Sequence, residues 1–194
     1  MNVLIVHGWQ NRRPEGHWQR WLAERLAVEG HEVRYPQFPS PDEPVPEEWT
    51  ALLRAELAAL GAGGGERVLI CHSLAVLLWW QVAPSFGALQ PDRVLLVAPP
   101  SADVLRGFPE VAAFAPSGIE TAELPADLRA RVRFVAADDD PYFPGGAAAL
   151  YADRFGLDAD VVPGGQHLDL PAGYGSWPSV HAWCTDPAVR ITAR

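Results

Sequence analysis

Two patterns of apolar and polar positions alternate along the chain. Short, continuous apolar runs such as residues 3–6 and 93–100 predict buried strands. Between such runs, apolar residues recur three and four positions apart, which predicts one buried face of a helix. In the stretch 16–30 the tryptophans and leucines share such a face, and Gly30 ends the pattern.

The same criteria divide the whole chain. Strands are expected at residues 3–6, 31–36, 67–71, 93–100, 131–137 and 158–163. Helices are expected at 16–30, 47–60, 74–83, 145–156 and 177–184. Connecting segments are a proline-rich loop at 37–46, a glycine-rich helix end at 61–65, and a stretch without clean periodicity from 100 to 131.

This alternation of strands and helices predicts an α/β fold. Continuous apolar strands are typical of a parallel sheet whose two faces are both covered by helices. We therefore expect a three-layer α/β/α sandwich with a six-stranded, mainly parallel sheet, in one domain that spans residues 1–194. Such sheets bind ligands at the carboxyl ends of their strands, so the polar residues that follow each strand are the candidates for a site.

Ser73 is the first such candidate, because it interrupts the apolar run "RVLICHSLAVLLWW" of residues 67–80. A buried hydroxyl without a partner costs about 1–3 kcal/mol, so Ser73 is either satisfied by nearby backbone or held where it can react. A serine between a strand and a helix is typical of a nucleophile elbow. The tight turn needs small residues two positions away, and Cys71 and Ala75 are small, although the usual glycines are absent.

An aspartate and a histidine follow later strands, in the order that a Ser-Asp-His triad takes in α/β-hydrolases. For the acid we favour Asp140 over Asp139, because Pro141 forces Asp140 into an extended or turn conformation. For the base we favour His167, in a glycine-rich turn, over His181, in the last predicted helix. The serine needs such a base to take its proton.

The oxyanion of an acyl-transfer reaction requires backbone donors that already point at it. We expect one from the N–H of Leu74, at the start of the helix, and one from Trp9, where Gly8 allows close approach. Leu105, Phe108 and Phe114 either line a modest acyl pocket or pack against the sheet.

The remaining histidines and a tryptophan pair have simpler interpretations. His72 is a poor base beside Ser73 and is expected to pack against or bond the elbow, and His31 is expected to face solvent. His17 either borders the site or anchors the start of its helix. Trp79 and Trp80 are expected on the buried face of the elbow helix, unless one is exposed at a dimer contact.

Composition excludes several classes of protein. The net charge is -9 and basic residues do not cluster, so phosphate backbones would be repelled and nucleic acid is not an expected partner. No apolar run approaches the length of a membrane span, and the first residues have no basic leader. Because Cys71 lies inside an apolar run, we expect Cys71 and Cys184 to be reduced thiols in a cytoplasmic protein.

Several motifs together resemble the small serine hydrolases of the retinoblastoma-binding-protein-nine/YdeN family, in the α/β-hydrolase superfamily. They are "VHGWQNRRPEGHWQRW" (6–21), "YPQFPSPDEPVPEEW" (35–49), "CHSLA" (71–75), "LLVAPP" (95–100), "DDDPYFP" (138–144) and "GGQHLDLPAGYGSWP" (164–178). The resemblance covers nearly the whole chain. It departs from the family pattern at the elbow glycines and at Gln166, where glycine is common.

The resemblance implies Ser73 as nucleophile, Asp140 as acid and His167 as base, on a minimal α/β-hydrolase fold without cofactor, and we expect no metal. The expected function is a carboxylesterase-like serine hydrolase acting on a small-molecule acyl substrate. Two other functions stay open: a non-catalytic protein-interaction module on the same scaffold, and a lyase or perhydrolase using the same site. A homodimer or an unknown protein partner is also possible from the sequence.

Overall fold

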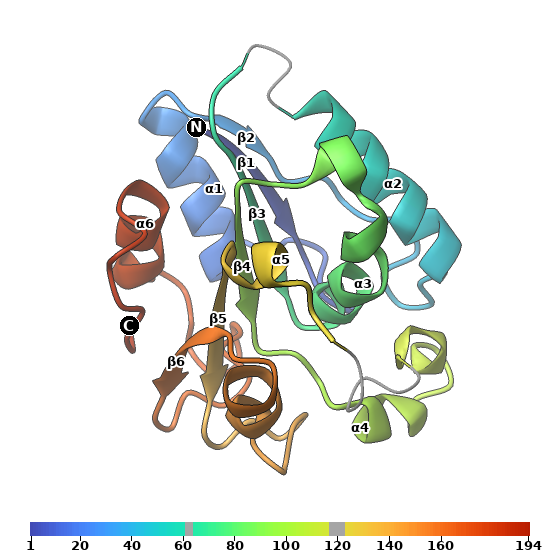
Figure 1. Cartoon of the computed structure of the whole chain (residues 1–194). Helices are drawn as coiled ribbons and strands as arrows, with labels where there is room; N and C mark the ends of the chain where they lie inside the picture. The colour runs from blue at the N-terminus through green and yellow to red at the C-terminus, as the bar shows by residue number, and fades with distance from the viewer. Residues whose placement is uncertain (61–63, 117–122) are drawn as a thin grey trace.

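The computed structural model describes residues 1–60, 64–116 and 123–194. Within these ranges, one six-stranded sheet has the order β2-β1-β3-β4-β5-β6, and every neighbouring pair is parallel (Figure 1). In chain order the strands are β1 (Asn2–Val6), β2 (Glu32–Arg34), β3 (Arg67–His72), β4 (Arg93–Val97), β5 (Val132–Ala137) and β6 (Asp158–Val162). The predicted six-stranded parallel sheet is confirmed.

Helices cover both faces of this sheet. The α-helices are α1 (Trp18–Val28), α2 (Pro46–Ala59), α3 (Leu74–Val82), α4 (Ala102–Arg106), α5 (Ala126–Arg129) and α6 (Pro178–Thr185). The other helical segments are the short 3₁₀ turns η1 (Ala83–Ser85), η2 (Gly87–Leu89) and η3 (Ala112–Phe114), and the π-helix η5 (Ala149–Arg154). Figure 1 shows α1 and α6 on one side of the sheet and α2 and α3 on the other.

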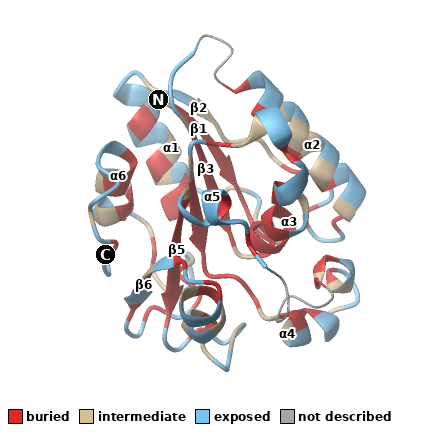
Figure 2. Cartoon of the chain, viewed as in Figure 1, coloured by how far each residue is buried: buried red, intermediate tan, exposed pale blue. Residues whose placement is uncertain are grey.

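The two faces of the strands account for the two layers of core. Successive side chains of a strand point to opposite faces. In β1, Val3 and Ile5 pack in the core under α1 and α6, whereas Leu4 and Val6 pack in the core under α2 and α3. All four side chains are fully buried, and Figure 2 shows the central strands as the buried layer of the molecule.

Some elements differ from their predicted bounds. The expected helix at 145–156 contains the π-helix η5, because an apolar pattern does not distinguish hydrogen bonding to the fourth residue from bonding to the fifth. The stretch 100–131 holds only short helical elements, and its residues 117–122 lie outside the described residues, as do residues 61–63 of the predicted glycine-rich helix end.

The structure bears on three further expectations, which concern the tryptophan pair of α3, the two cysteines and membrane-spanning helices. Trp79 and Trp80 are both buried, so neither is exposed at a dimer contact. Cys71 and Cys184 are free and buried, as predicted, and burial raises the pKa of both thiols. Among the described residues, every helix is too short or too polar to cross a bilayer.

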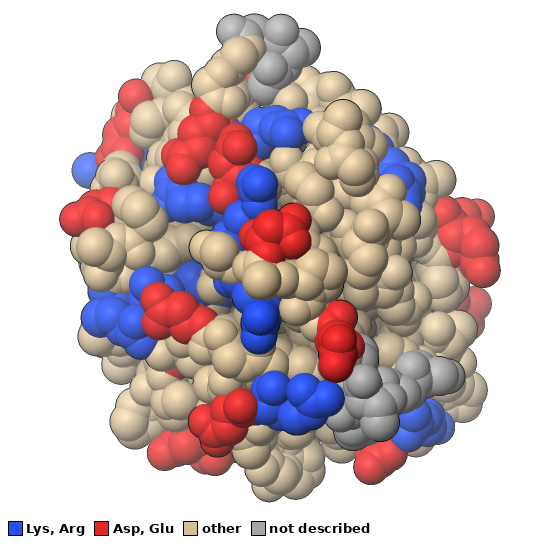
Figure 3. Space-filling view, viewed as in Figure 1, with Lys and Arg blue, Asp and Glu red and all other residues tan. Residues whose placement is uncertain are grey.

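Acidic and basic side chains are interspersed on the surface and do not form large patches of one charge. On the face that Figure 3 shows, acidic and basic side chains alternate. Many arginines pair with carboxylates: the nitrogen–oxygen distance is 2.6 Å for Arg93 and Glu66 and 2.8 Å for Arg133 and Asp158. A continuous basic surface of the kind that binds phosphate backbones is not present on this face.

The strand order also fixes where a site can form. The chain leaves β1 for the edge strand β2, crosses back over β1 to β3, and then proceeds through β4, β5 and β6. The order therefore reverses between β1 and β3, and the loops that follow these two strands diverge at their carboxyl ends. This divergence is the place where open parallel sheets bind ligands.

Candidate active site

Ser73 lies in the tight turn between β3 and α3. Its φ of 56° and ψ of -122° are in a region that residues other than glycine avoid, at a cost of about 1–3 kcal/mol. The backbone N–H of Ser73 holds the turn by donating to the carbonyl oxygen of Val97 at 2.9 Å. Cys71 and Ala75 are fully buried on either side, which explains why both positions carry small residues.

The structure brings Ser73, His167 and Asp140 together. His167 follows β6, and its Nε2 lies 2.8 Å from Ser73 Oγ. Its Nδ1 lies 2.9 Å from one carboxylate oxygen of Asp140, which follows β5, and 3.1 Å from the other. Asp140 is only 4% exposed, and Oδ1 also accepts a hydrogen bond from the Tyr142 N–H at 2.8 Å. This is the contact order of a nucleophile, a base and an orienting acid.

The other two aspartates of the run hold the histidine loop. Asp138 accepts a hydrogen bond from the Gly164 N–H at 2.8 Å, and Asp139 accepts one from the Gln166 N–H at 2.7 Å. The run Asp138–Asp140 therefore joins the end of β5 to the loop after β6 at three successive positions. Asp139, the alternative acid, contacts the backbone of this loop rather than the imidazole.

The alternative base, His181, lies elsewhere. Its Nε2 contacts the carboxylate of Glu29 at 2.8 Å, and its ring packs edge-on against Trp21 on α1. These contacts hold α6 against α1. His181 does not line the cavity around Ser73.

His72 bonds the elbow to the histidine loop, one of the two roles expected for it. Its Nε2–H donates to the backbone carbonyl of His167 at 3.0 Å, and the ring is 3% exposed. Burial lowers the pKa of His72 well below its ordinary value, so the ring is neutral. His72 thus fixes the loop that carries His167.

His7 plays a comparable role in the loop after β1, which sequence reasoning missed. Its Nε2 accepts a hydrogen bond from the Phe38 N–H at 2.9 Å, so Nδ1 carries the proton and donates to the Gly8 carbonyl at 2.8 Å. The N–H of a trans peptide points away from its C=O. By holding the Gly8 carbonyl, His7 therefore orients the opposite edge of that peptide, the Trp9 N–H.

The two expected oxyanion donors are available. Leu74 is the first residue of α3, where an N–H has no partner within the helix. Among the described residues no acceptor takes the N–H of Leu74 or of Trp9. Both residues line the same cavity as Ser73.

Gly8→Ala is expected to lower kcat/KM about 100-fold, because displacing a reacting group by about 1 Å costs that much. A Cβ at position 8 would lie 2.7 Å from Ser73 Cβ and 3.2 Å from Ser73 Oγ. Steady-state kinetics with a nitrophenyl ester measures the loss, and thermal unfolding shows whether the variant is folded. Gly145→Ala is the matched control, because a Cβ there meets nothing within 4 Å. Equal activity of the two variants would contradict the close approach.

A cavity of about 320 Å³ opens above Ser73. Two of the three predicted pocket residues, Leu105 and Phe108, line it, and Phe108 packs against Trp9 with ring centroids 5.2 Å apart. Phe114 does not line the cavity, and of its two expected interpretations the structure favours packing in the interior. This ring is fully buried and packs against Trp49 on α2, because η3 turns it into the core instead of toward the cavity.

His17 begins α1, as one of its two interpretations expected, and also borders the cavity. Its Nδ1 accepts a hydrogen bond from the Gln19 N–H at 3.2 Å and so caps the helix. The side chain is among those that line the cavity. Burial lowers the pKa of His17 to about 4, and burial likewise lowers the pKa of His7 to about 4.

These buried imidazoles predict that the free energy of unfolding decreases as the pH falls from 6.5 toward 4. In this range the unfolded chain binds protons at histidines of ordinary pKa, whereas the folded chain excludes them, so acid favours unfolding. Urea denaturation at pH 7, 6 and 5 measures the effect. His17→Asn keeps a helix-capping side chain but removes one imidazole, and its pH dependence should be shallower. An unchanged slope would contradict this assignment.

Among the described residues, no three histidine, cysteine, aspartate or glutamate side chains are grouped so that they could hold a metal ion. The imidazoles near Ser73 are instead engaged by backbone groups and by Asp140.

The sequence profile of the family described as "Serine hydrolase" matches residues 3–185, which include all the residues of the site. The chain belongs to the serine hydrolase family. It is therefore a hydrolase, as the sequence predicted. No curated protein matches the chain.

Solved structures similar to this hydrolase share its fold. The ydeN gene product from B. subtilis is 22% identical, with a TM-score of 0.72, over 94% of this chain and 96% of that one. A YdeN-like hydrolase from Pectobacterium atrosepticum is 19% identical, with a TM-score of 0.70, over 93% and 86%. A structure from a study of the metagenome-derived lipolytic enzymes LipS and LipT is 18% identical, with a TM-score of 0.56, over 83% and 82%. The expected resemblance to YdeN-like α/β-hydrolases is confirmed.

Proposed function

We propose that this hydrolase cleaves a small acyl ester, thioester or amide through a covalent acyl-enzyme on Ser73. The observation that carries the proposal is the continuous series of contacts from Ser73 Oγ to His167 Nε2, at 2.8 Å, and from His167 Nδ1 to Asp140, at 2.9 Å. A serine hydroxyl is a weak nucleophile unless a neighbouring base takes its proton. The series supplies that base and the acid that orients it.

In the first half of the reaction, Ser73 Oγ attacks the carbonyl carbon of the substrate while His167 Nε2 takes the hydroxyl proton. The carbonyl oxygen becomes an oxyanion, which the N–H groups of Leu74 and Trp9 stabilise by about 3 kcal/mol each. The bond to the leaving group then breaks. His167 passes its proton to the leaving oxygen, sulfur or nitrogen, and the acyl group stays on Oγ.

In the second half, water replaces the leaving group. His167 Nε2 takes a proton from water as the water oxygen attacks the acyl carbon, and the bond to Oγ then breaks. The proton returns to Ser73, so the net reaction consumes one water and yields a carboxylic acid and the free leaving group. Asp140 accepts the Nδ1–H throughout and so keeps Nε2 free to take protons.

The acyl group is proposed to lie against the apolar wall of the cavity. Trp9, Leu105 and Phe108 make up this wall, and the 320 Å³ volume suits a small or unbranched acyl chain. A panel of nitrophenyl esters with acyl chains of two to ten carbons tests the proposal, which expects kcat/KM to fall for the longest chains.

The decisive test of hydrolysis is turnover of a nitrophenyl ester with analysis of both products. The proposal expects release of nitrophenol and the free carboxylic acid by the wild type, and none above background by Ser73→Ala. No turnover of any acyl substrate by the wild type would favour a protein-interaction module on this scaffold. A product other than the acid, such as a peracid formed only with peroxide, would favour non-hydrolytic chemistry.

We also propose a reducing, cytoplasmic location. The two free, buried thiols Cys71 and Cys184 support it, because secreted proteins of this size commonly pair their cysteines.

A further inference from the structure

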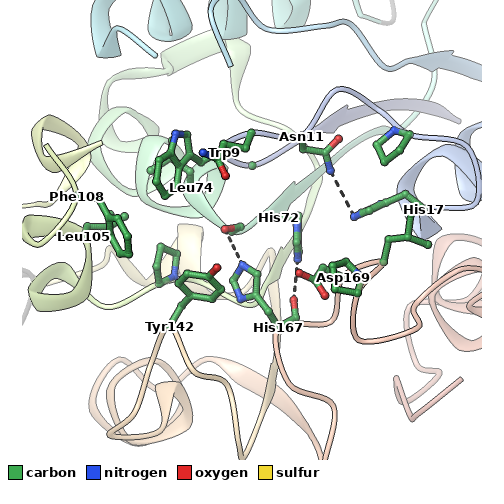
Figure 4. A pocket seen from close by; sticks show the side chains of 17 residues that line it. Trp9, Asn11, His17, His72, Leu74, Leu105, Phe108, Tyr142, His167 and Asp169 are labelled. Atoms are coloured by element: carbon green, nitrogen blue, oxygen red, sulfur yellow. Dashed lines mark hydrogen bonds between the residues drawn. The ribbon is translucent and has the colours of Figure 1, made fainter. Parts of the chain in front are cut away.

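The cavity around Ser73 has two walls of opposite character. Figure 4 shows Trp9, Leu105 and Phe108 on one side of the His167 ring, and Asn11, His17 and Asp169 on the other. The apolar wall has a role in the proposed function. We define the polar wall as Asn11, His17 and Asp169. The reaction proposed above does not use these three side chains.

The polar wall carries an uncompensated negative charge. Among the described residues that line the cavity, and apart from the histidines, only Asp169 has a charged side chain, and no described arginine pairs with it. Its Oδ1 accepts a hydrogen bond from the Ala172 N–H at 2.9 Å, which fixes the carboxylate at the end of the histidine loop. The nearby imidazoles of His17 and His72 resist protonation, because burial lowers the pKa of both.

The rest of the polar wall consists of hydrogen-bond donors. Because His17 Nδ1 accepts from Gln19, the neutral ring carries its proton on Nε2. Asn11 Oδ1 accepts from the Arg13 N–H at 2.7 Å, so the Asn11 amide nitrogen is the group that faces His17 Nε2, at 3.4 Å. The acceptor atoms of Asn11 and His17 are thus already used by Arg13 and Gln19, so the Asp169 carboxylate is the group of the polar wall that can pair with a cation.

The chemistry of the triad decides which part of the substrate lies here. The apolar wall takes the acyl chain, and His167 Nε2 must reach the leaving oxygen, so the leaving group extends past the His167 ring toward the polar wall. We propose that the substrate is an ester whose alcohol part carries a protonated or quaternary amine, and that Asp169 binds this cation. The inference rests on the proposed function and names the leaving group that this site prefers.

Three esters of matched size test the proposal at pH 7. They are 3-methylbutyl propionate, which is neutral, 2-(dimethylamino)ethyl propionate, which carries the cation in the alcohol, and 3-methylbutyl glycinate, which carries it in the acyl group. The wild type is expected to hydrolyse the aminoalkyl ester with a kcat/KM about tenfold above that of the neutral ester. This preference should weaken as salt is added, because salt screens a partly exposed charge pair.

Substitutions then assign the preference to one side chain. Asp169→Asn keeps the shape and the acceptor for Ala172 but removes the charge, so the ratio of kcat/KM for the aminoalkyl ester to kcat/KM for the neutral ester is expected to fall from about ten to about one. Asp169→Glu is expected to retain most of the preference. Asp127→Asn is the matched control: it removes one exposed carboxylate from α5, away from the cavity lining, and should leave the preference intact.

The possible failures are distinguishable. An unchanged preference in Asp169→Asn, no preference in the wild type, or a preference for the glycinate would overturn the inference and leave the proposed function standing. If the wild type hydrolyses neither these esters nor any nitrophenyl ester, the proposed function fails. Titration calorimetry of 2-(dimethylamino)ethyl propionate with Ser73→Ala then tests whether Asp169 binds the cation. Binding that is abolished when Asp169→Asn is added to Ser73→Ala supports the inference. No binding, or binding that persists without the Asp169 carboxylate, overturns it.

Discussion

His167→Ala is expected to lower kcat/KM for a nitrophenyl ester by about 10⁴-fold. Without the imidazole, no group is positioned to take the proton of Ser73 Oγ, which lies 2.8 Å from Nε2 in the intact site. Steady-state kinetics measures the effect, with pre-steady-state mixing to establish whether acylation is the step that slows.

His181→Ala is the matched control for this variant. His181 is also bonded to a carboxylate, that of Glu29, at 2.8 Å, but it lies away from the cavity. Its replacement should change kcat/KM less than about twofold, since surface ion pairs contribute little. A comparable loss in both variants would point to general destabilisation and contradict the assignment of the base.

Asp140→Asn is expected to lower kcat about 10³- to 10⁴-fold with little change in the fold. The Tyr142 N–H donates to Oδ1 at 2.8 Å, so an amide here would keep its oxygen at that position and turn its NH₂ toward His167 Nδ1. The imidazole would then be protonated on Nε2 instead of Nδ1, and it could not accept the proton of Ser73. The rate of acylation measures this loss.

Asp139→Asn tests whether the neighbouring carboxylate could take over this role. Asp139 accepts one hydrogen bond from the Gln166 N–H at 2.7 Å, and an amide oxygen can accept the same bond. We therefore expect at least a third of the wild-type activity to remain, because an amide oxygen accepts a single backbone N–H bond at only a small cost relative to a carboxylate oxygen. A larger loss in Asp139→Asn than in Asp140→Asn would exchange the two assignments.

The members of the site could be predicted from the sequence because a parallel sheet brings the ends of its strands to one edge. Ser73, Asp140 and His167 each follow a strand, so their positions in the sequence were sufficient to predict that they lie close together. The choice of Asp140 over Asp139 depended on Pro141, and the structure brings Asp140, not Asp139, against the imidazole.

Contacts between distant loops could not be predicted in the same way. The His7 ring is fixed by the N–H of Phe38, and nothing in the local pattern of either segment indicates that pairing. The position of Phe114 could not be predicted from its local sequence either. An aromatic residue without helical periodicity near it can face a cavity or the core, and its contact with Trp49 is set by how η3 packs against α2.

The loop after β6 shows how local and tertiary information divide. Its glycines predicted a turn at His167, but the residues that hold this turn come from elsewhere. Asp138 and Asp139 bind its backbone N–H groups, and His72 binds the carbonyl of His167. His167 is thus placed by the two neighbouring loops as much as by its own.

The central claim is that Ser73 is a reactive nucleophile, and covalent labelling tests it most directly. A fluorophosphonate probe is added to the wild type and to Ser73→Ala, and the modified peptide is located by mass spectrometry. The account predicts one adduct on Ser73 in the wild type and none in the variant. An unlabelled wild type, or an adduct that persists in Ser73→Ala, would contradict it.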